Sequence, residues 1–240
     1  MKDHTDKGDI SPFSSLMVAL AANIGAGNII GVGVAIAAGG PGAIFWCWLT
    51  GVLGMATRYS EGLLAIKYRV ENKDGNMSGG PMFVLERGMK CKWLGVLFAV
   101  FTAIAAFGIG NLTQGNAAAE QLYHAFSIPA WGTATVLTAL TALVMLGGIR
   151  GIARVCAFFV PVMAVLYILG CMYILIVQAD YILPAIRYIL DCAFTGEAAA
   201  GGVVGAAVMT AMRTGVARGL FSNEAGMGST PHAHAMAKGE

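Results

Sequence analysis

The sequence predicts an all-α integral membrane protein, and three observations support this prediction. Of the 240 residues, 57% are hydrophobic and only 12% are charged, whereas soluble domains carry about 25% charged residues. Several uncharged stretches approach the roughly 20 residues that a helix needs to cross a bilayer. Two of the apolar stretches are interrupted by glycine and polar residues. Such a chain cannot cover itself with polar surface, so the lipid bilayer is its expected solvent.

Residues 1–13 are expected to form a cytoplasmic N-terminal segment, and residues 14–240 a partial transmembrane domain. Residues 1–10 are polar and lack the apolar core of a cleavable signal peptide, so the first apolar stretch has to direct membrane insertion. A net charge of +2 gives no reason to expect a nucleic-acid partner. The five cysteines are scattered without a CxxC pair, which does not favour a metal site or a disulfide framework.

Six apolar stretches are predicted to be membrane spans, about five of them full and the sixth broken. Each is close to the length that a bilayer-crossing helix needs, the second only if it continues past Arg58. They are residues 14–38, 42–57, 93–119, 128–149, 155–179 and a stretch from about 198 to 212. The chain is therefore expected to cross the membrane several times.

Lysine and arginine gather on alternate connections between these spans. Cationic loops remain in the cytoplasm, which places the N-terminus in the cytoplasm and directs odd-numbered spans outward. The intervening connections carry no cation, or only Arg187. Residues 82–87 are compatible with both an interfacial helix and an ordinary loop. The cationic connections carry Lys2 and Lys7; Arg58, Lys67, Arg69, Lys73, Arg87, Lys90 and Lys92; and Arg150 and Arg154.

The first span contains a glycine-rich break between Asn23 and Asn28. Each glycine costs a helix up to about 1 kcal/mol, and irregular backbone at membrane depth persists only where it lines a cavity. A dinucleotide-binding loop does not fit, because no strand precedes the glycines. A helix-packing face of Gly27 and Gly31 is the structural alternative. The two asparagines favour a binding site, since amide oxygens suit a hard cation such as sodium and the N–H groups of a broken helix suit a carboxylate.

A second break is predicted at residues 221–228. Paired broken helices are the best indication that a sequence gives of a transporter's binding site. The third span adds Asn111 and Gln114, which lie three residues apart and so on one helical face. Gln114 is compatible both with an interhelical hydrogen bond and with binding to the polar atoms of a solute.

Together these motifs resemble the alanine or glycine:cation symporters, the sodium:alanine symporter family. The resemblance runs in order along nearly the whole chain. The matching segments are Gly8-Asp9-Ile10-Ser11-Pro12-Phe13, residues 22–32, residues 39–46, Gly79-Gly80-Pro81-Met82, residues 107–111 and residues 215–226.

The resemblance implies the leucine-transporter-like fold of the amino acid/polyamine/organocation superfamily, which has two inverted repeats of five helices and would be incomplete here. It implies symport of a small neutral amino acid, alanine or glycine, into the cell by alternating access. Sodium is the implied coupling ion, with no other cofactor and no enzymatic activity. The implied location is a plasma membrane of the bacterial type.

In that fold, two broken helices hold the substrate at mid-membrane. Carried over, main-chain amides near Gly25 and Gly27 take the substrate carboxylate, and Phe221 closes over the substrate. The implied substrate contacts are Gly25, Ala26, Gly27, Gln114, Phe221 and Ser222, and the implied sodium ligands are Asn23, Asn28 and Ser222.

The chain departs from the family pattern in two ways. The family often has threonine or serine where Asn23 and Ala26 stand, and the hydroxyl missing at Ala26 bears on selectivity or ion affinity. Family members are also about twice as long, so these 240 residues are expected to lack most of the second repeat. Alternating access needs one repeat to move against another, and the isolated chain is therefore expected not to transport.

Charged residues near the breaks suggest further hypotheses. Arg213 and Arg218 are expected to line an outer vestibule or to pair with carboxylates. Glu224 is interpreted either as an ion-linked carboxylate or as a helix cap. Arg58 and Glu61 are three residues apart and are interpreted as a structural ion pair.

Two other functions are weighed against the carrier. One is a membrane scaffold that does not transport, for which replacing Gln114 or Asn28 would leave solute binding unchanged. The other is a membrane-embedded enzyme, which is disfavoured because no nucleophile-and-base pair has usable spacing. His232 and His234 have HxH spacing but no third ligand, so no transition-metal site is expected. The acidic or basic candidates for an enzyme are Glu61, Glu120, Glu224 and His232.

Overall fold

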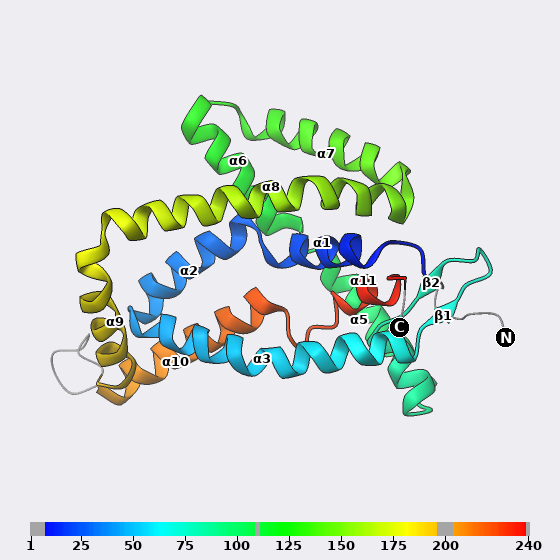
Figure 1. Ribbon diagram of the computed structural model, residues 1–240, viewed down its shortest axis with the longest axis horizontal. Helices are drawn as coiled ribbons and strands as arrows, with labels where there is room; N and C mark the ends of the chain where they lie inside the picture. The colour runs from blue at the N-terminus through cyan, green and yellow to red at the C-terminus, as the bar shows by residue number, and fades with distance from the viewer. Residues whose placement is uncertain (1–7, 109–110, 196–203, 239–240) are drawn as a thin grey trace. The chain divides into compact units, whose positions relative to one another are not determined.

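The computed structural model describes residues 8–108, 111–195 and 204–238, and this part of the chain is almost entirely helical (Figure 1). Lys2 and Lys7, which are predicted to lie on the cytoplasmic side, are outside the described residues, as is the start of the sixth apolar stretch at Ala198. The elements are α1 (Pro12–Asn23), α2 (Ala26–Gly39), α3 (Gly42–Lys67), β1 (Val70–Glu71), β2 (Met77–Ser78), α4 (Pro81–Phe83), the π-helical turn η2 (Val84–Gly88), α5 (Lys92–Ala106), α6 (Asn111–Phe126), α7 (Ala130–Leu146), α8 (Gly148–Val177), α9 (Ala179–Phe194), α10 (Val204–Asn223) and α11 (Pro231–Ala235).

Two helical segments in the described part of the chain are long and apolar enough to cross a membrane. They are Pro12–Gly39, which contains α1 and α2, and α8. The apolar helices α5 and α7 are shorter. Large apolar side chains of α8, among them Phe158, Leu166 and Ile176, are exposed. Because exposed apolar surface costs about 25 cal/mol per Å² in water, these side chains suit contact with lipid.

The chain forms two compact units. The first comprises Met1–Gly27, Tyr59–Pro161 and Met227–Glu240, and the second comprises Asn28–Arg58 and Val162–Gly226. The chain leaves the first unit between Gly27 and Asn28 and re-enters it between Gly226 and Met227. Two of the crossings between units therefore fall at the two predicted helix breaks.

In the first unit, α11 lies beside α1 (Figure 1). The buried hydroxyl of Ser15, in α1, donates a hydrogen bond of 2.9 Å to the main-chain oxygen of Ala233, in α11. Just before α1, Ile10 pairs with Ala237 in a parallel bridge, and the Lys238 N–H donates to the Ile10 oxygen at 2.9 Å. Segments that are far apart in sequence thus hold each other in place.

A short antiparallel hairpin, β1–β2, is the exception to the all-α prediction among the described residues. Its turn contains Gly75, whose φ of 76° lies in the left-handed region that glycine adopts without strain. The Met77 N–H donates to the Asp9 carboxylate at 2.7 Å, and Arg69 Nη1 donates to the Ala237 oxygen at 2.9 Å. The hairpin is therefore bound both to the segment before α1 and to the one after α11.

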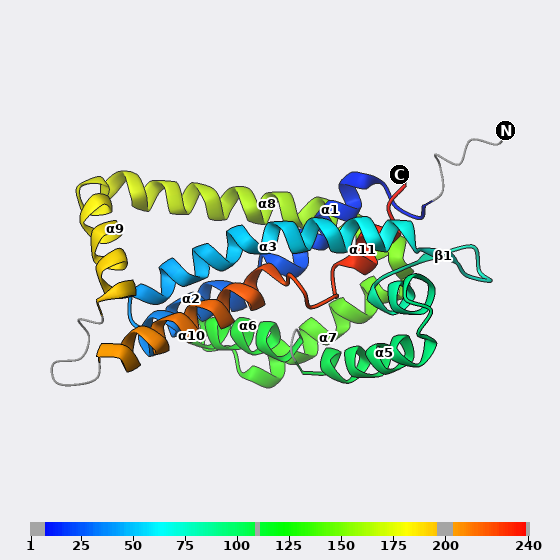
Figure 2. The same ribbon diagram turned by 90° about the horizontal axis from the view of Figure 1, so that it is seen from below.

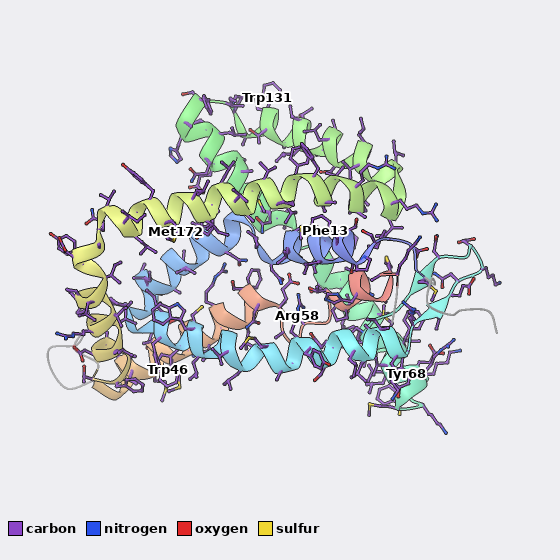
Figure 3. All side chains as sticks on the ribbon, viewed as in Figure 1. Phe13, Trp46, Arg58, Tyr68, Trp131 and Met172 are labelled. Atoms are coloured by element: carbon purple, nitrogen blue, oxygen red, sulfur yellow. The ribbon has the colours of Figure 1, made fainter. Side chains whose placement is uncertain are left out.

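In the second unit, α10 packs against α2 and the first half of α3 through glycines (Figure 2). A Cβ atom on Gly215 would overlap the main-chain oxygen of Ala43, and one on Gly219 would lie 2.7 Å from the Thr50 Cβ. Small residues allow helix backbones to approach this closely. Next to this contact, Trp46 (labelled in Figure 3) lies 5.8 Å from the Phe194 ring of α9, centroid to centroid.

Helix boundaries agree with the predicted spans at some places and differ at others. α3 continues past Arg58 to Lys67, as the second span requires, and residues 82–87 are helical rather than an ordinary loop. The predicted third span, residues 93–119, is divided into α5 and α6. Glycine is the physical reason, because Gly108 lies in the turn that ends α5, where its N–H donates to the Ala105 oxygen at 3.1 Å, and it lowers the helix propensity there.

Candidate functional site

The first break is narrower than predicted. α1 ends at Asn23, Ile24 is extended with φ −103° and ψ 95°, and α2 begins at Ala26. Gly27, predicted to be unwound, is in the first turn of α2. Only residues 24 and 25 interrupt the helix, because the Ile24 N–H still bonds to the Leu20 oxygen at 2.7 Å and closes α1. The first four N–H groups of a helix lack intrahelical acceptors, so the start of α2 offers main-chain donors that suit an anion.

Gln114, in the first turn of α6, lies against this break within the first unit. A Cβ atom on Gly25 would lie 2.8 Å from Gln114 Oε1 and 2.9 Å from its Cδ, and would overlap Nε2. The side-chain amide therefore rests on the Cα atom of Gly25, and only glycine leaves it room. The structure thus brings together two residues that the sequence assigns to substrate, which are 89 positions apart in the chain (114 − 25).

Asn28 and Arg218 form a contact in the second unit that the sequence does not reveal. Arg218 Nη2 donates a hydrogen bond of 2.7 Å to Asn28 Oδ1, the amide oxygen predicted to bind sodium. The guanidinium carbon also lies 5.0 Å from the centroid of the Phe221 ring, a cation–π distance. Arg218 is predicted to line an outer vestibule or to pair with carboxylates. In the structure its guanidinium contacts the Asn28 amide and the Phe221 ring. Arg213 is exposed on α10.

The second break begins later than predicted. Phe221 and Ser222 lie in the last turn of α10 rather than in unwound chain, because the glycines of the predicted break, Gly226 and Gly228, both follow Asn223. α10 ends at Asn223, and the Asn223 side chain stabilises this end of the helix. Its Oδ1 accepts a hydrogen bond from the Ala225 N–H at 3.0 Å, and its Nδ2 donates one to the Thr50 oxygen at 3.2 Å. The chain then takes left-handed φ values at Glu224, 50°, and at Gly226, 85°. Asn223 is a site residue that sequence reasoning missed, although asparagine next to a glycine break is a known turn signal.

Arg58 of α3, labelled in Figure 3, reaches Glu224 at the start of this break within the second unit. Its Nη2 atom lies 3.9 Å from the Glu224 carboxylate, and each side chain is 19% exposed. Glu224 is thus the carboxylate of an ion pair with Arg58, and its role as a proton- or ion-linked carboxylate or as a helix cap stays a prediction. The ion pair of Arg58 with Glu61 stays a prediction.

The remaining predicted site residues lie at or near helix ends. Asn23 is the last residue of α1 and is half-buried, as is Ser222 beside Phe221. Of the side chains of Ala26 and Asn111 nothing is described. The predicted site residues fall in both units. The first unit contains Asn23, Gly25, Ala26, Gly27 and Gln114, and the second contains Asn28, Phe221 and Ser222.

The histidines of α11 have a structural environment. His232 Nδ1 lies 2.6 Å from the Gly79 oxygen. A Cβ atom on Gly80 would lie 2.5 Å from the His232 ring, so glycine is needed there for a second reason besides its φ of 133°. Across residues 8–108, 111–195 and 204–238, no group of three His, Cys, Asp or Glu side chains is placed to hold a metal ion.

Comparison with known proteins identifies similar chains. The model of the sodium:alanine symporter family matches residues 1–240. The chain is 50% identical over 241 residues to the sodium/alanine symporter AgcS of Methanococcus maripaludis, which covers 99% of this chain and 52% of AgcS. It is 50% identical over 238 residues to an uncharacterized transporter of Haemophilus influenzae, with 99% and 52% covered. It is 38% identical over 231 residues to the probable sodium/glutamine symporter GlnT of Bacillus subtilis, with 96% and 47% covered. The chain thus spans about half the length of the curated relatives that it matches.

Proposed function

Because the chain belongs to the sodium:alanine symporter family, an integral membrane family of transporters rather than enzymes, we propose that it serves the sodium-coupled uptake of a small neutral amino acid. Alanine and glycine are the proposed substrates, and sodium is the proposed coupling ion. The proposed setting is a plasma membrane of the bacterial type, crossed several times, with the N-terminus in the cytoplasm. A leucine-transporter-like fold is part of the same proposal.

The observation that carries the proposal is the position of Gln114 on Gly25. An amide side chain at membrane depth is costly, and here it lies beside the one interruption of the Pro12–Gly39 helical segment. Main-chain N–H groups at the start of α2 suit the carboxylate of an amino acid. The Gln114 amide, which both donates and accepts hydrogen bonds, suits the remaining polar atoms of the same small molecule.

The proposed cation ligands are oxygen atoms, as sodium requires. Asn28 offers its side-chain oxygen, Asn23 stands at the end of α1, and Ser222 offers a hydroxyl in the last turn of α10. The roles of Ala26 and Gly27 are main-chain roles at the start of α2. Phe221 is proposed to close over the amino acid.

Transport is tested best in a fused carrier, in which this chain replaces the stretch of M. maripaludis AgcS that it matches. Reconstituted in liposomes, the fused carrier is expected to accumulate radiolabelled alanine under an inward sodium gradient and not under a potassium gradient. Excess glycine should compete for uptake, while the 240-residue chain alone should show none. Uptake that proceeds equally without sodium would contradict the proposal.

A scaffold without a solute site is the competing function. It predicts that Gln114→Ala and Asn28→Ala leave alanine and sodium binding to the fused carrier unchanged. The proposed function predicts that Gln114→Ala weakens alanine binding and that Asn28→Ala weakens sodium binding.

A further inference from the structure

Arg218 places a permanent positive charge on an atom that the proposed function assigns to sodium. The guanidinium belongs to α10, donates its 2.7 Å hydrogen bond to Asn28 Oδ1, and stacks on Phe221. All three residues belong to the second unit. An arginine within an apolar helix is costly and characteristically marks an ion or substrate pathway, so this contact calls for a functional explanation.

Gly31, one turn beyond Asn28 in α2, makes room for the guanidinium. A Cβ atom at this position would overlap Cζ, Nη1 and Nε of Arg218. Two residues further along α2, a Cβ atom on Gly33 would meet nothing within 4 Å. The chain therefore offers a matched pair of glycines, of which one touches the guanidinium and the other does not.

We propose that Arg218 sets the sodium affinity of Asn28, because its guanidinium must leave Oδ1 before a sodium ion can bind there. The proposal rests on the proposed function, in which Asn28 is a sodium ligand. Two cations on one amide oxygen repel each other, and the repulsion is stronger in a partly buried site than in water. Sodium binding is then an exchange of one cation for another. The displaced guanidinium keeps the face of Phe221 as a partner.

The proposal distinguishes Arg218 from a residue that simply attracts the carboxylate of the substrate. If the guanidinium competes with sodium, then removing it strengthens sodium binding. If it serves as the counter-charge of a bound amino acid, then removing it weakens alanine binding and leaves sodium binding as it was.

The test is equilibrium binding of ²²Na⁺, and in parallel of radiolabelled alanine, to the purified 240-residue chain in lipid nanodiscs. Binding is measured by scintillation proximity for the parent chain, Asn28→Ala and the variants below, with monodispersity checked for each. Arg218→Gln is expected to lower the sodium Kd at least tenfold. Gly31→Ala keeps the arginine but pushes its guanidinium away from Asn28, so it is also expected to lower the sodium Kd. Gly33→Ala is the matched control and should bind as the parent chain does. Sodium binding that appears only in Arg218→Gln would also support the proposal.

The outcomes separate this proposal from the proposed function. If sodium binding depends on Asn28 but is unchanged or weaker in both Arg218→Gln and Gly31→Ala, the competition proposal is wrong and the sodium site stands. If Arg218→Gln weakens alanine binding alone, the guanidinium is a counter-charge and the proposal is likewise wrong. If no variant binds sodium, or if Asn28→Ala binds it as tightly as the parent chain, the sodium site itself fails and this proposal with it.

Discussion

Arg58 holds Glu224 by two nitrogen atoms. Its Nη1 atom donates to the main-chain oxygen of Glu224 at 3.3 Å, and its Nη2 atom lies 3.9 Å from the carboxylate of the same residue. Arg58, in α3, thus contacts both the carboxylate and the main-chain oxygen of Glu224, the residue that follows α10. This matters because Glu224 has a left-handed φ of 50°, which is unfavourable for a residue other than glycine.

Arg58→Met is expected to destabilise the chain by about 1–3 kcal/mol, since it removes the guanidinium from a mostly buried carboxylate and from a main-chain oxygen. Glu224→Gln should cost less, because the main-chain acceptor remains. Thermal unfolding of the purified protein measures both changes. Arg150→Met, at an exposed position of α8, is the control. Equal melting temperatures for Arg58→Met and the control would show that the pair contributes nothing to stability.

Gly25→Ala is expected to raise the KM of the fused carrier for alanine about tenfold, which corresponds to about 1.4 kcal/mol of binding free energy. The added methyl group would occupy the position of the Gln114 amide. Gln114→Ala should have a similar effect, and the double variant should be no worse than the more severe single variant, because both changes remove the same amide. Gly33→Ala, which meets open space, should keep the parent KM. Additive losses in the double variant would instead indicate independent roles.

Gly215→Ala is expected to destabilise the second unit, because its Cβ atom would overlap the Ala43 oxygen and lie 2.7 Å from the Trp46 Cβ. Backbone atoms cannot move aside as a flexible side chain can, and overpacking typically costs about 1–3 kcal/mol. Gly51→Ala in α3 meets nothing within 4 Å. It should stabilise the helix by up to about 1 kcal/mol through helix propensity. The melting temperatures of the two variants should therefore shift in opposite directions.

Ser15→Ala is expected to cost about 1–3 kcal/mol, because the buried Ala233 oxygen loses its 2.9 Å hydrogen bond. Hydrogen exchange followed by mass spectrometry should show faster exchange in α11. Ser14→Ala is the neighbouring control, since the Ser14 hydroxyl forms its hydrogen bond with Ser11 in an exposed position. Unchanged protection of α11 in Ser15→Ala would mean that this bond does not hold the helix in place.

The sequence predicts much of the helical structure and part of the site. Uncharged stretches locate α7 and α8 well, because apolar length is a direct physical requirement of a bilayer. Glycine and asparagine locate both breaks to within a few residues. The exact ends differ because they depend on single hydrogen bonds, such as the one from the Ala225 N–H to Asn223.

Contacts between residues that are far apart in the chain could not be predicted from sequence patterns. Arg218 and Asn28 are 190 positions apart, and nothing in either segment specifies the other. Arg58 illustrates the same limit, since helical spacing suggests its neighbour Glu61, while the structure also brings Glu224 to it across 166 positions. Spacing rules describe one helix at a time, whereas these pairings depend on how helices pack.

The bond between Ser15 and Ala233 joins residues that are synthesised far apart in time, because they are 218 positions apart. α1 leaves the ribosome well before α11, the short helix that covers Ser15. Until then, the Ser15 hydroxyl lacks the Ala233 oxygen, and closing so long a loop carries a large entropic cost. The chain between the two residues, 218 positions, must therefore be translated before α1 acquires this lasting neighbour.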